Sequence, residues 1–244
     1  MSVTIIIPAL DEAAALPTTL ASLAALTPPP AEIILVDGGS TDDTCAIAQA
    51  AGIKTIKTKL ANRAAQMNAG AAQASSSILC FLHADTDLPT DFIELAADTL
   101  ARPSTALAGF VSIMRGPSKV RRVTTAHNYI KTWYAPLVFR PLSFFRGVRL
   151  LFGDQVMICR KPDFDAIDGF DPRQTIMEEA DFCLRMVRAG RGRVRQIHRK
   201  VWSSDRRVAK WGPVRSNLTY LYIGMMWGLG RAPDKLARHY ADVR

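Results

Sequence analysis

The first half of the chain alternates short apolar runs with segments that have the composition of helices. Strands are expected at 3–8, 32–37, 52–58 and 77–84. Helices are expected at 12–25, 41–52 and 61–74. The runs VTIIIP and EIILVD are continuous and rich in β-branched residues, which is typical of strands buried on both faces. Strands that alternate with helices predict an α/β fold with a Rossmann-like, mostly parallel central sheet flanked by helices.

The second half of the chain is less regular. Strands are expected at 106–115, 154–160 and 193–198, and helices at 178–189 and 213–230. The segment 118–152 is basic and aromatic and is interrupted by Pro136 and Pro141. Because neither a repeat nor a low-complexity linker divides the sequence, we expect one domain over 1–205, followed by a basic helical extension over 206–244.

The net charge of +9 is distributed unevenly along the chain. Residues 1–114 carry 5 Lys and Arg against 11 Asp and Glu, whereas residues 115–244 carry 26 against 11. The basic second half, residues 115–244, indicates an anionic partner. A phosphorylated substrate, a nucleic acid or an anionic membrane would each fit this charge. A composition with 48% hydrophobic and 22% charged residues excludes a disordered or collagen-like chain.

The four cysteines show no CxxC spacing, and three of them lie in apolar runs. They indicate buried thiols in a reducing compartment rather than a disulfide framework or a zinc site. The opening MSVTIIIPAL has no basic residue before its apolar run, so we expect no signal peptide. No apolar run reaches the ~18 residues that span a bilayer. These features predict a cytoplasmic protein, either free or peripheral on the inner face of the membrane.

Carboxylates follow three of the predicted strands. Asp11 and Glu12 follow the first, Asp37 follows the second, and Asp85 and Asp87 follow the strand at 77–84. A single carboxylate of this kind is ordinarily a turn or cap residue. Three strand ends that converge at one sheet edge instead favour a divalent cation, Mn²⁺ or Mg²⁺, bound together with phosphate oxygens. Neither GxxxxGK[ST] nor GxGxxG occurs, which argues against P-loop NTPases and dinucleotide-binding dehydrogenases.

Six segments carry a combined signature. They are IIIPALDE (5–12), ILVDGGSTDDT (34–44), ANRAAQMNAGAAQA (61–74), FLHADTDLP (81–89), GDQ (153–155) and MEEADFCLRM (177–186). Together they resemble the motifs of family 2 glycosyltransferases. Their residues are most similar to those of a bacterial subgroup of small, stand-alone enzymes in that family. The resemblance implies a GT-A fold over 1–205, with a nucleotide-sugar half at 1–115 and an acceptor half at 116–205.

The resemblance also implies roles for individual residues. The donor, a nucleoside-diphosphate sugar with a uridine nucleotide favoured, would contact Pro8, Ala9, Leu10, Glu12, Asp37, Gly39, Arg63, Asn68, Asp85 and Arg206. The acceptor side would include Gly153, Asp154, Gln155 and Glu178. Arg206 and Arg207 either neutralise the leaving diphosphate or form a solvated basic turn.

Two positions depart from the family pattern. His83 stands where the family has the first Asp of its metal-binding Asp-x-Asp, so the resemblance implies Asp85 as the metal ligand, with Asp87 second. His83 itself is either a ligand or a strand-end histidine. Glu179 stands where the family has its catalytic Asp, with Asp181 in reserve as general base. The implied reaction is one displacement that inverts the anomeric centre, without a covalent intermediate on the enzyme.

The apolar stretch 218–229 is expected to be a core helix that covers the sheet. Contact with an anionic membrane, or a homodimer interface, is the alternative for it and for the aromatic segment 129–152. Either region could admit a hydrophobic or lipid-linked acceptor. A nucleic acid is not expected as partner, because the acidic strand ends would repel its phosphates.

Three rival functions share part of this evidence. The first is a nucleotide-sugar-binding protein that has lost catalysis, the second a nucleotidyltransferase, and the third a basic scaffold on a membrane surface. The turn PALDEAAAL after the first strand lacks the basic, Gly-rich loop of many nucleotidyltransferases. A scaffold would leave the acidic strand ends without a role.

Overall fold

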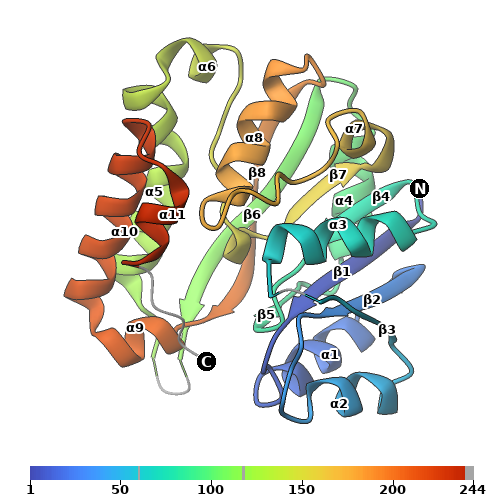
Figure 1. Ribbon diagram of the computed structural model, residues 1–244. Helices are drawn as coiled ribbons and strands as arrows, with labels where there is room; N and C mark the ends of the chain where they lie inside the picture. The colour runs from blue at the N-terminus through green and yellow to red at the C-terminus, as the bar shows by residue number, and fades with distance from the viewer. Residues whose placement is uncertain (60, 117–118, 240–244) are drawn as a thin grey trace.

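The computed structural model describes residues 1–59, 61–116 and 119–239, and these form a layered α/β structure around one eight-stranded sheet (Figure 1). The strand order is β3-β2-β1-β4-β7-β6-β8-β5. The strands are β1 Val3–Ala9, β2 Glu32–Asp37, β3 Lys54–Lys57, β4 Ile78–Phe81, β5 Thr86–Asp87, β6 Thr105–Arg115, β7 Met157–Arg160 and β8 Arg193–Ser204.

Most neighbouring strands run in the same direction. Strands β3, β2, β1 and β4 are parallel, and β8 is parallel to β6. Strand β7 lies antiparallel between β4 and β6, and β5 is antiparallel to β8. The predicted mostly parallel sheet is therefore confirmed. The carboxyl ends of β1, β2 and β4 meet at one edge, where parallel sheets bind their ligands.

Helices cover both faces of the sheet. The helices are α1 Leu16–Ala24, α2 Thr44–Ala50, α3 Arg63–Gln73, α4 Phe92–Leu100, α5 Arg122–Phe139, α6 Pro141–Phe145, α7 Lys161–Asp165, α8 Glu178–Arg188, α9 Arg206–Trp211, α10 Pro213–Gly228 and α11 Pro233–Ala237, with a 3₁₀ turn at Gly153–Gln155. Ile6 belongs to the core beneath α3 and α8, whereas Ile5 and Ile7 belong to the core beneath α1 and α4. This alternation explains why every residue of β1 is buried.

Several predicted boundaries move. The strand predicted at 77–84 ends at Phe81, so His83 and Asp85 lie in the turn that follows. The strand predicted at 154–160 begins at Met157, because the GDQ segment forms the 3₁₀ turn. The last strand runs to Ser204 rather than ending at 198, since it continues to pair with β6. Cys80, Cys159 and Cys183 are buried free thiols, as expected, and Cys45 is half-buried.

The predicted role of the C-terminal apolar stretch as a core helix on the sheet is wrong. It forms α10, which packs beside α5 at a distance from the sheet (Figure 1). Asn217 contacts His127 and Thr124 at one end of this pair, each at 3.0 Å. Only Ser216 and Ile223 of α10 are buried. Among the described residues, no helix combines the length and apolar character needed to cross a bilayer.

Candidate active site

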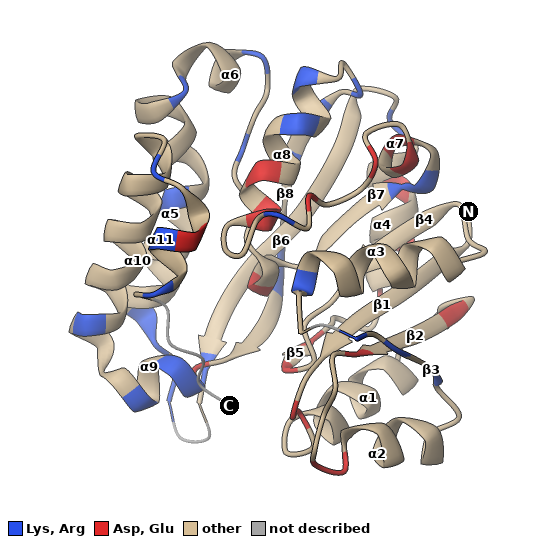
Figure 2. Ribbon diagram, viewed as in Figure 1, with Lys and Arg blue, Asp and Glu red and all other residues tan. Residues whose placement is uncertain are grey.

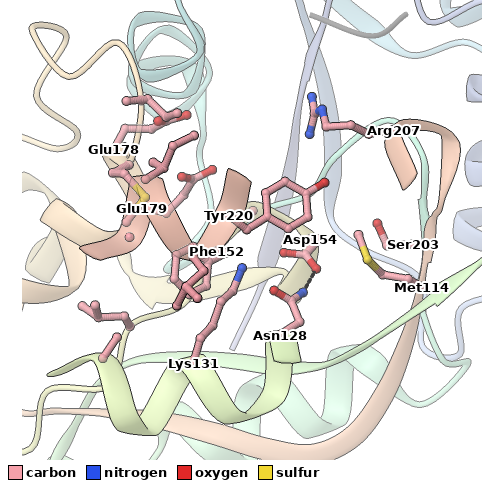
Figure 3. Close-up of a pocket in the computed structure, with 18 of the residues that line it drawn as sticks. Met114, Asn128, Lys131, Phe152, Asp154, Glu178, Glu179, Ser203, Arg207 and Tyr220 are labelled. Carbon is pink, nitrogen blue, oxygen red and sulfur yellow. Dashed lines mark hydrogen bonds between the residues drawn. The ribbon is translucent and has the colours of Figure 1, made fainter. Parts of the chain in front are cut away.

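A cavity of about 320 Å³ lies between the sheet edge and the α5–α10 pair. One end of it is polar and carries side chains from α3, α8 and the turn after β4. The other end is apolar and is walled by α5 and α10. Figure 3 shows Lys131 and Asn128 rising from α5, with Glu178 and Glu179 on one side of Tyr220 and Arg207 on the other. The cavity therefore joins charged groups to an apolar chamber.

Glu178 and Glu179 begin α8 and are 5% and 6% exposed. Met177, which precedes them, has the left-handed φ of 65°, and this conformation turns the chain into the helix. Burial, together with the neighbouring Glu179 carboxylate, raises the pKa of Glu178 to about 7. Burial also raises the pKa of Glu179. Two adjacent buried carboxylates with raised pKa values are characteristic of acid–base sites.

Cationic and neutral groups surround this pair. Arg63 Nη1 lies 3.5 Å from Glu178 Oε1 and 4.0 Å from Glu179 Oε1. His83 Nε2 lies 3.8 Å from Glu179 Oε1. Burial, aided by the charge of Arg63, lowers the pKa of His83 to about 4, so its imidazole is neutral at pH 7. Burial lowers the pKa of Lys131, and Asp154 and Glu179 oppose that shift because they attract its ammonium group.

Gly153 brings the 3₁₀ turn against the carboxylate pair. A Cβ atom at this position would collide with His83 Nε2 and stand 2.6 Å from Glu179 Oε1. The next residue, Asp154, accepts a hydrogen bond from Asn128 Nδ2 and lines the cavity (Figure 3). Gly153, Asp154 and Glu178 all line the cavity, and their assignment to the acceptor side stays a prediction.

The edge of the sheet carries a second charged cluster. Arg206 donates to both oxygens of Glu12, at 2.7 and 2.6 Å, and its Nη2 lies 3.1 Å from Asp85 Oδ2. The bidentate pair ties α9 to the loop that follows β1. Arg206 thus offsets the repulsion between these carboxylates, a task that the sequence assigned to a bound cation alone.

Some predicted site residues lie outside the cavity. Asp87 pairs with Arg115 at 3.1 Å. Asp181 pairs with Arg185 at 2.7 Å, one turn further along α8. Neither lines the cavity. The geometry therefore favours Asp85 over Asp87 as a metal ligand and Glu179 over Asp181 as a base, and these roles stay predictions.

Two further predicted binding residues hold parts of the fold together, and their binding roles stay predictions. The amide of Asn68 donates to Phe170 O at 2.8 Å and accepts from Phe170 N at 2.9 Å, so both of its polar groups hold the loop before α8. Gln155 is fully buried, and its Oε1 accepts from Phe152 N at 3.0 Å. Its Nε2 donates to Thr132 Oγ1 at 3.0 Å. Neither residue lines the cavity.

The remaining predicted donor residues shape the loops after β1 and β2. Pro8 and Ala9 end β1, and Leu10 follows them, but none of the three lines the cavity. Asp37 accepts from Gly39 N at 3.2 Å and from Ser40 N at 3.0 Å. Although burial alone would raise the pKa of Asp37, the hydrogen bonds from Ser40 and Gly39 lower it. Contact of these residues with a nucleotide stays a prediction.

Lys131, Asn128 and Tyr220 line the cavity but are not among the residues predicted from the sequence. Lys131 Nζ lies 3.7 Å from the centroid of the Phe152 ring, beside the carboxylates. A signal was present in the sequence: Asn128, Thr132 and Ala135 recur at helical spacing and form the buried side of α5. Polar residues on the inward face of a helix indicate hydrogen-bond partners in the interior, here Asp154 and Gln155.

The polar end offers few ligands for a metal. Among the residues described, no group of three or more His, Cys, Asp or Glu side chains is arranged to hold one. Asp85 lines the cavity, and His83 Nε2 is buried there without a hydrogen-bond partner in the described part of the chain. Mg²⁺ ordinarily needs only one or two carboxylates when substrate phosphates complete its coordination. Asp85 and the orphaned His83 nitrogen therefore fit a cation bound jointly with a diphosphate.

Comparisons with known proteins identify the family. The sequence pattern of Glycosyl transferase family 2 matches residues 4–163. A "PGL/p-HBAD biosynthesis glycosyltransferase" of Mycobacterium tuberculosis is 31% identical over 196 residues, which cover 74% of this chain and 68% of that protein.

Solved structures agree on the fold. The mannosyltransferase PcManGT from Pyrobaculum calidifontis, in complex with GDP-Man and Mn²⁺, aligns with a TM-score of 0.70 and 16% identity over 95% of this chain and 66% of its own. S. aureus TarS 1-349, in complex with UDP-GlcNAc, aligns with a TM-score of 0.61 and 13% identity over 93% of this chain and 67% of its own. The chain spans only 39% of the longer TarS structure. The eight-stranded sheet thus has the GT-A arrangement, and the chain belongs to glycosyl transferase family 2 and is a glycosyltransferase.

Proposed function

We propose that this glycosyltransferase moves a sugar from a nucleoside-diphosphate sugar, preferably a UDP-sugar, to an acceptor hydroxyl with inversion at the anomeric carbon. The observation that carries the proposal is the buried Glu178–Glu179 pair, which shares one cavity with the Asp85–Arg206 cluster. A single displacement requires a base for the acceptor hydroxyl and a cluster that neutralises the charge of the leaving diphosphate.

Glu179 is the proposed general base. Burial raises the pKa of Glu179, which makes its ionised form a stronger base than an exposed glutamate. It takes the proton of the acceptor hydroxyl as that oxygen forms a bond to the anomeric carbon. The bond from this carbon to the diphosphate oxygen breaks, and its electron pair leaves with the nucleoside diphosphate. Arg63 and Lys131 limit the repulsion that ionised Glu178 exerts on Glu179.

The leaving diphosphate is assigned to the Asp85–Arg206 end. Arg206 would hold phosphate oxygens there through charge-assisted hydrogen bonds. Asp85, with His83 beside it, would hold Mn²⁺ or Mg²⁺, which supplies Lewis-acid stabilisation of the diphosphate when bound. The UDP-GlcNAc complex of TarS and the GDP-Man and Mn²⁺ complex of PcManGT support a donor of this class.

The acceptor is proposed to be a molecule with an apolar part, such as a lipid-linked hydroxyl compound. Ile223 and Met225 of α10 and Val138 of α5 line the cavity beyond the carboxylates. A wholly polar acceptor would leave this apolar wall in contact with water, whereas an apolar segment would cover it.

Two measurements test the reaction. Calorimetric titration of UDP, GDP and CDP, with and without Mn²⁺, should give metal-dependent binding of one nucleotide, and Asp85→Ala should remove it. Donor turnover should fall about 10²–10⁴-fold in Glu179→Gln, while donor affinity stays within about twofold. Asp181→Asn is the matched control, because Asp181 lies outside the cavity. Absence of nucleotide binding, or equal turnover by Glu179→Gln and the wild type, would refute the proposal.

A further inference from the structure

Helix α10 carries an apolar stripe that no part of the described chain covers. Val214, Leu218, Leu221 and Met225 recur every three or four residues and are 72%, 61%, 45% and 38% exposed. This spacing places them on one side of the helix. A helix that only completed the protein core would bury this side, whereas α10 leaves it exposed.

The stripe continues onto the neighbouring helices. Val123, Ile130 and Leu137 of α5 are spaced by seven residues and are exposed, as are Leu142 and Phe145 of α6. Of the fourteen large apolar side chains that are exposed in the described part of the chain, twelve lie on α5, α6 and α10 or at the end of α10. We call this set the apolar face. Concentration of so many exposed apolar groups on one structural unit marks an interaction surface.

The charge of these helices is of one sign. Residues 122–145 and 206–228 form α5, α6, α9 and α10 and carry seven Lys and Arg but no Asp or Glu. Figure 2 shows blue segments on α9 and at the adjoining end of α10, and no red on these four helices. Arg122, Lys210 and Arg215 are among the exposed cations. A second copy of the same face would therefore meet it with like charge, whereas an anionic surface would be attracted.

The apolar face is continuous with the cavity. Val138, Leu221 and Met225 are exposed members of the face and also line the cavity wall. The cavity thus borders the apolar face and reaches inward to Glu178 and Glu179. A molecule that leaves an apolar phase at this face could bring a hydroxyl to the carboxylates without exposing its apolar part to water.

We propose that the apolar face docks on an anionic lipid bilayer, with the exposed side chains of α5, α6 and α10 in the headgroup–acyl boundary and the flanking cations on the lipid headgroups. An amphipathic helix pair with basic flanks binds such a surface through apolar burial plus electrostatic attraction. The docking requires no catalytic step, so it stands apart from the proposed transfer reaction, although it would supply that reaction with a lipid-borne acceptor.

Vesicle sedimentation tests the docking. Wild-type protein should bind vesicles of phosphatidylcholine with about one third phosphatidylglycerol at least about tenfold more tightly than phosphatidylcholine alone, and added salt should weaken this binding. Leu218→Glu/Leu229→Glu should lower the partition coefficient at least about tenfold. Lys210→Ala/Arg215→Ala should lower it about fivefold per cation removed.

The control variant adds the same negative charge at a site away from the apolar face. Ala21→Glu/Ala24→Glu adds the same two negative charges to exposed positions of α1, far from the apolar face (Figure 1). It should sediment like the wild type. Neither Leu218 nor Leu229 lines the cavity, so UDP affinity by calorimetry should be unchanged in the face variant and reports separately on the proposed transfer function.

Three results would overturn the docking. The first is equal binding, or none, to the two vesicle types. The second is equal loss in the α1 control, which would assign the effect to net charge rather than to the face. The third is a combination of two observations: neither protein binds vesicles, and the wild type is a dimer that Leu218→Glu/Leu229→Glu converts to a monomer. This combination would make the apolar face a contact between two copies of the chain.

Discussion

Replacement of Glu178 by Gln should stabilise the protein at alkaline pH. Burial and the adjacent Glu179 raise the pKa of Glu178 from 4.5 to about 7, so the folded chain favours its protonated form. A shift of this size corresponds to about 3 kcal/mol between the two protonation states. The stabilising contribution of the protonated carboxyl is complete below pH 4.5 and is lost as the pH rises through about 7.

Glu178→Gln retains the shape of the protonated side chain at every pH. At pH 8 we expect its free energy of unfolding to exceed that of the wild type by about 1–3 kcal/mol, and near pH 4.5 by almost nothing. The lower bound allows for loss of the Arg63 contact, which is weakened by the 44% exposure of the Arg63 side chain. For a chain of this size, each kcal/mol raises the Tm by about 2–4 °C.

Thermal and urea unfolding, followed by circular dichroism between pH 4.5 and 8.5, measure this difference. Glu94→Gln is the matched control, because Glu94 is an exposed residue of α4 outside the cavity. It should change the free energy of unfolding by less than about 0.5 kcal/mol at either pH. A gain in Glu178→Gln that is independent of pH, or a loss of stability at pH 8, would refute the argument from a buried carboxylate.

Three further substitutions test one contact in the fold and two parts of the site. Gln66→Leu should lower the free energy of unfolding, measured by urea titration, by about 2–4 kcal/mol. Gln66 Nε2 donates to Ala9 O and Val36 O, each at 2.8 Å, and both carbonyls would lose this donor. An unchanged urea midpoint would show that water replaces the lost amide donor. Gly153→Ala should slow donor turnover at least about tenfold, since its Cβ would displace His83 and Glu179; wild-type turnover would mean that the turn shifts freely. Arg206→Lys should weaken UDP binding about tenfold by calorimetry, because lysine cannot keep the bidentate contact with Glu12 near Asp85; unchanged affinity would limit Arg206 to holding the loop.

The parallel half of the fold follows directly from local sequence patterns. Strands β1 and β2 are continuous apolar runs because helices cover both faces of the sheet there. The insertion of β7 between β4 and β6, in contrast, depends on pairings between residues far apart in the chain. The two-residue strand β5 exists only because β8 runs on past residue 198 to meet it. Local periodicity contains no information on such partners.

The sequence indicates the residue types of the candidate site but not their geometry. Glu179 and Asp181 are two residues apart, and at 3.6 residues per turn they point to nearly opposite sides of α8. Glu179 consequently faces the cavity, and Asp181 faces Arg185. Acidic residue type alone could not distinguish the two. The resemblance to a family supplied the order of preference, and the helix geometry supplies its physical reason.

Two features of this sequence reduce the stability of the fold, a buried pair of carboxylates and an exposed apolar stripe, and both border the same cavity. Glu178 and Glu179 are buried side by side, which costs folding free energy at neutral pH. The stripe on α10 leaves apolar groups in water that a core helix would bury. Departures of this kind persist where function requires them. Because Leu221 and Met225 belong to the stripe and also line the cavity of the two glutamates, the proposed transfer to a hydroxyl that arrives with an apolar carrier would account for both departures.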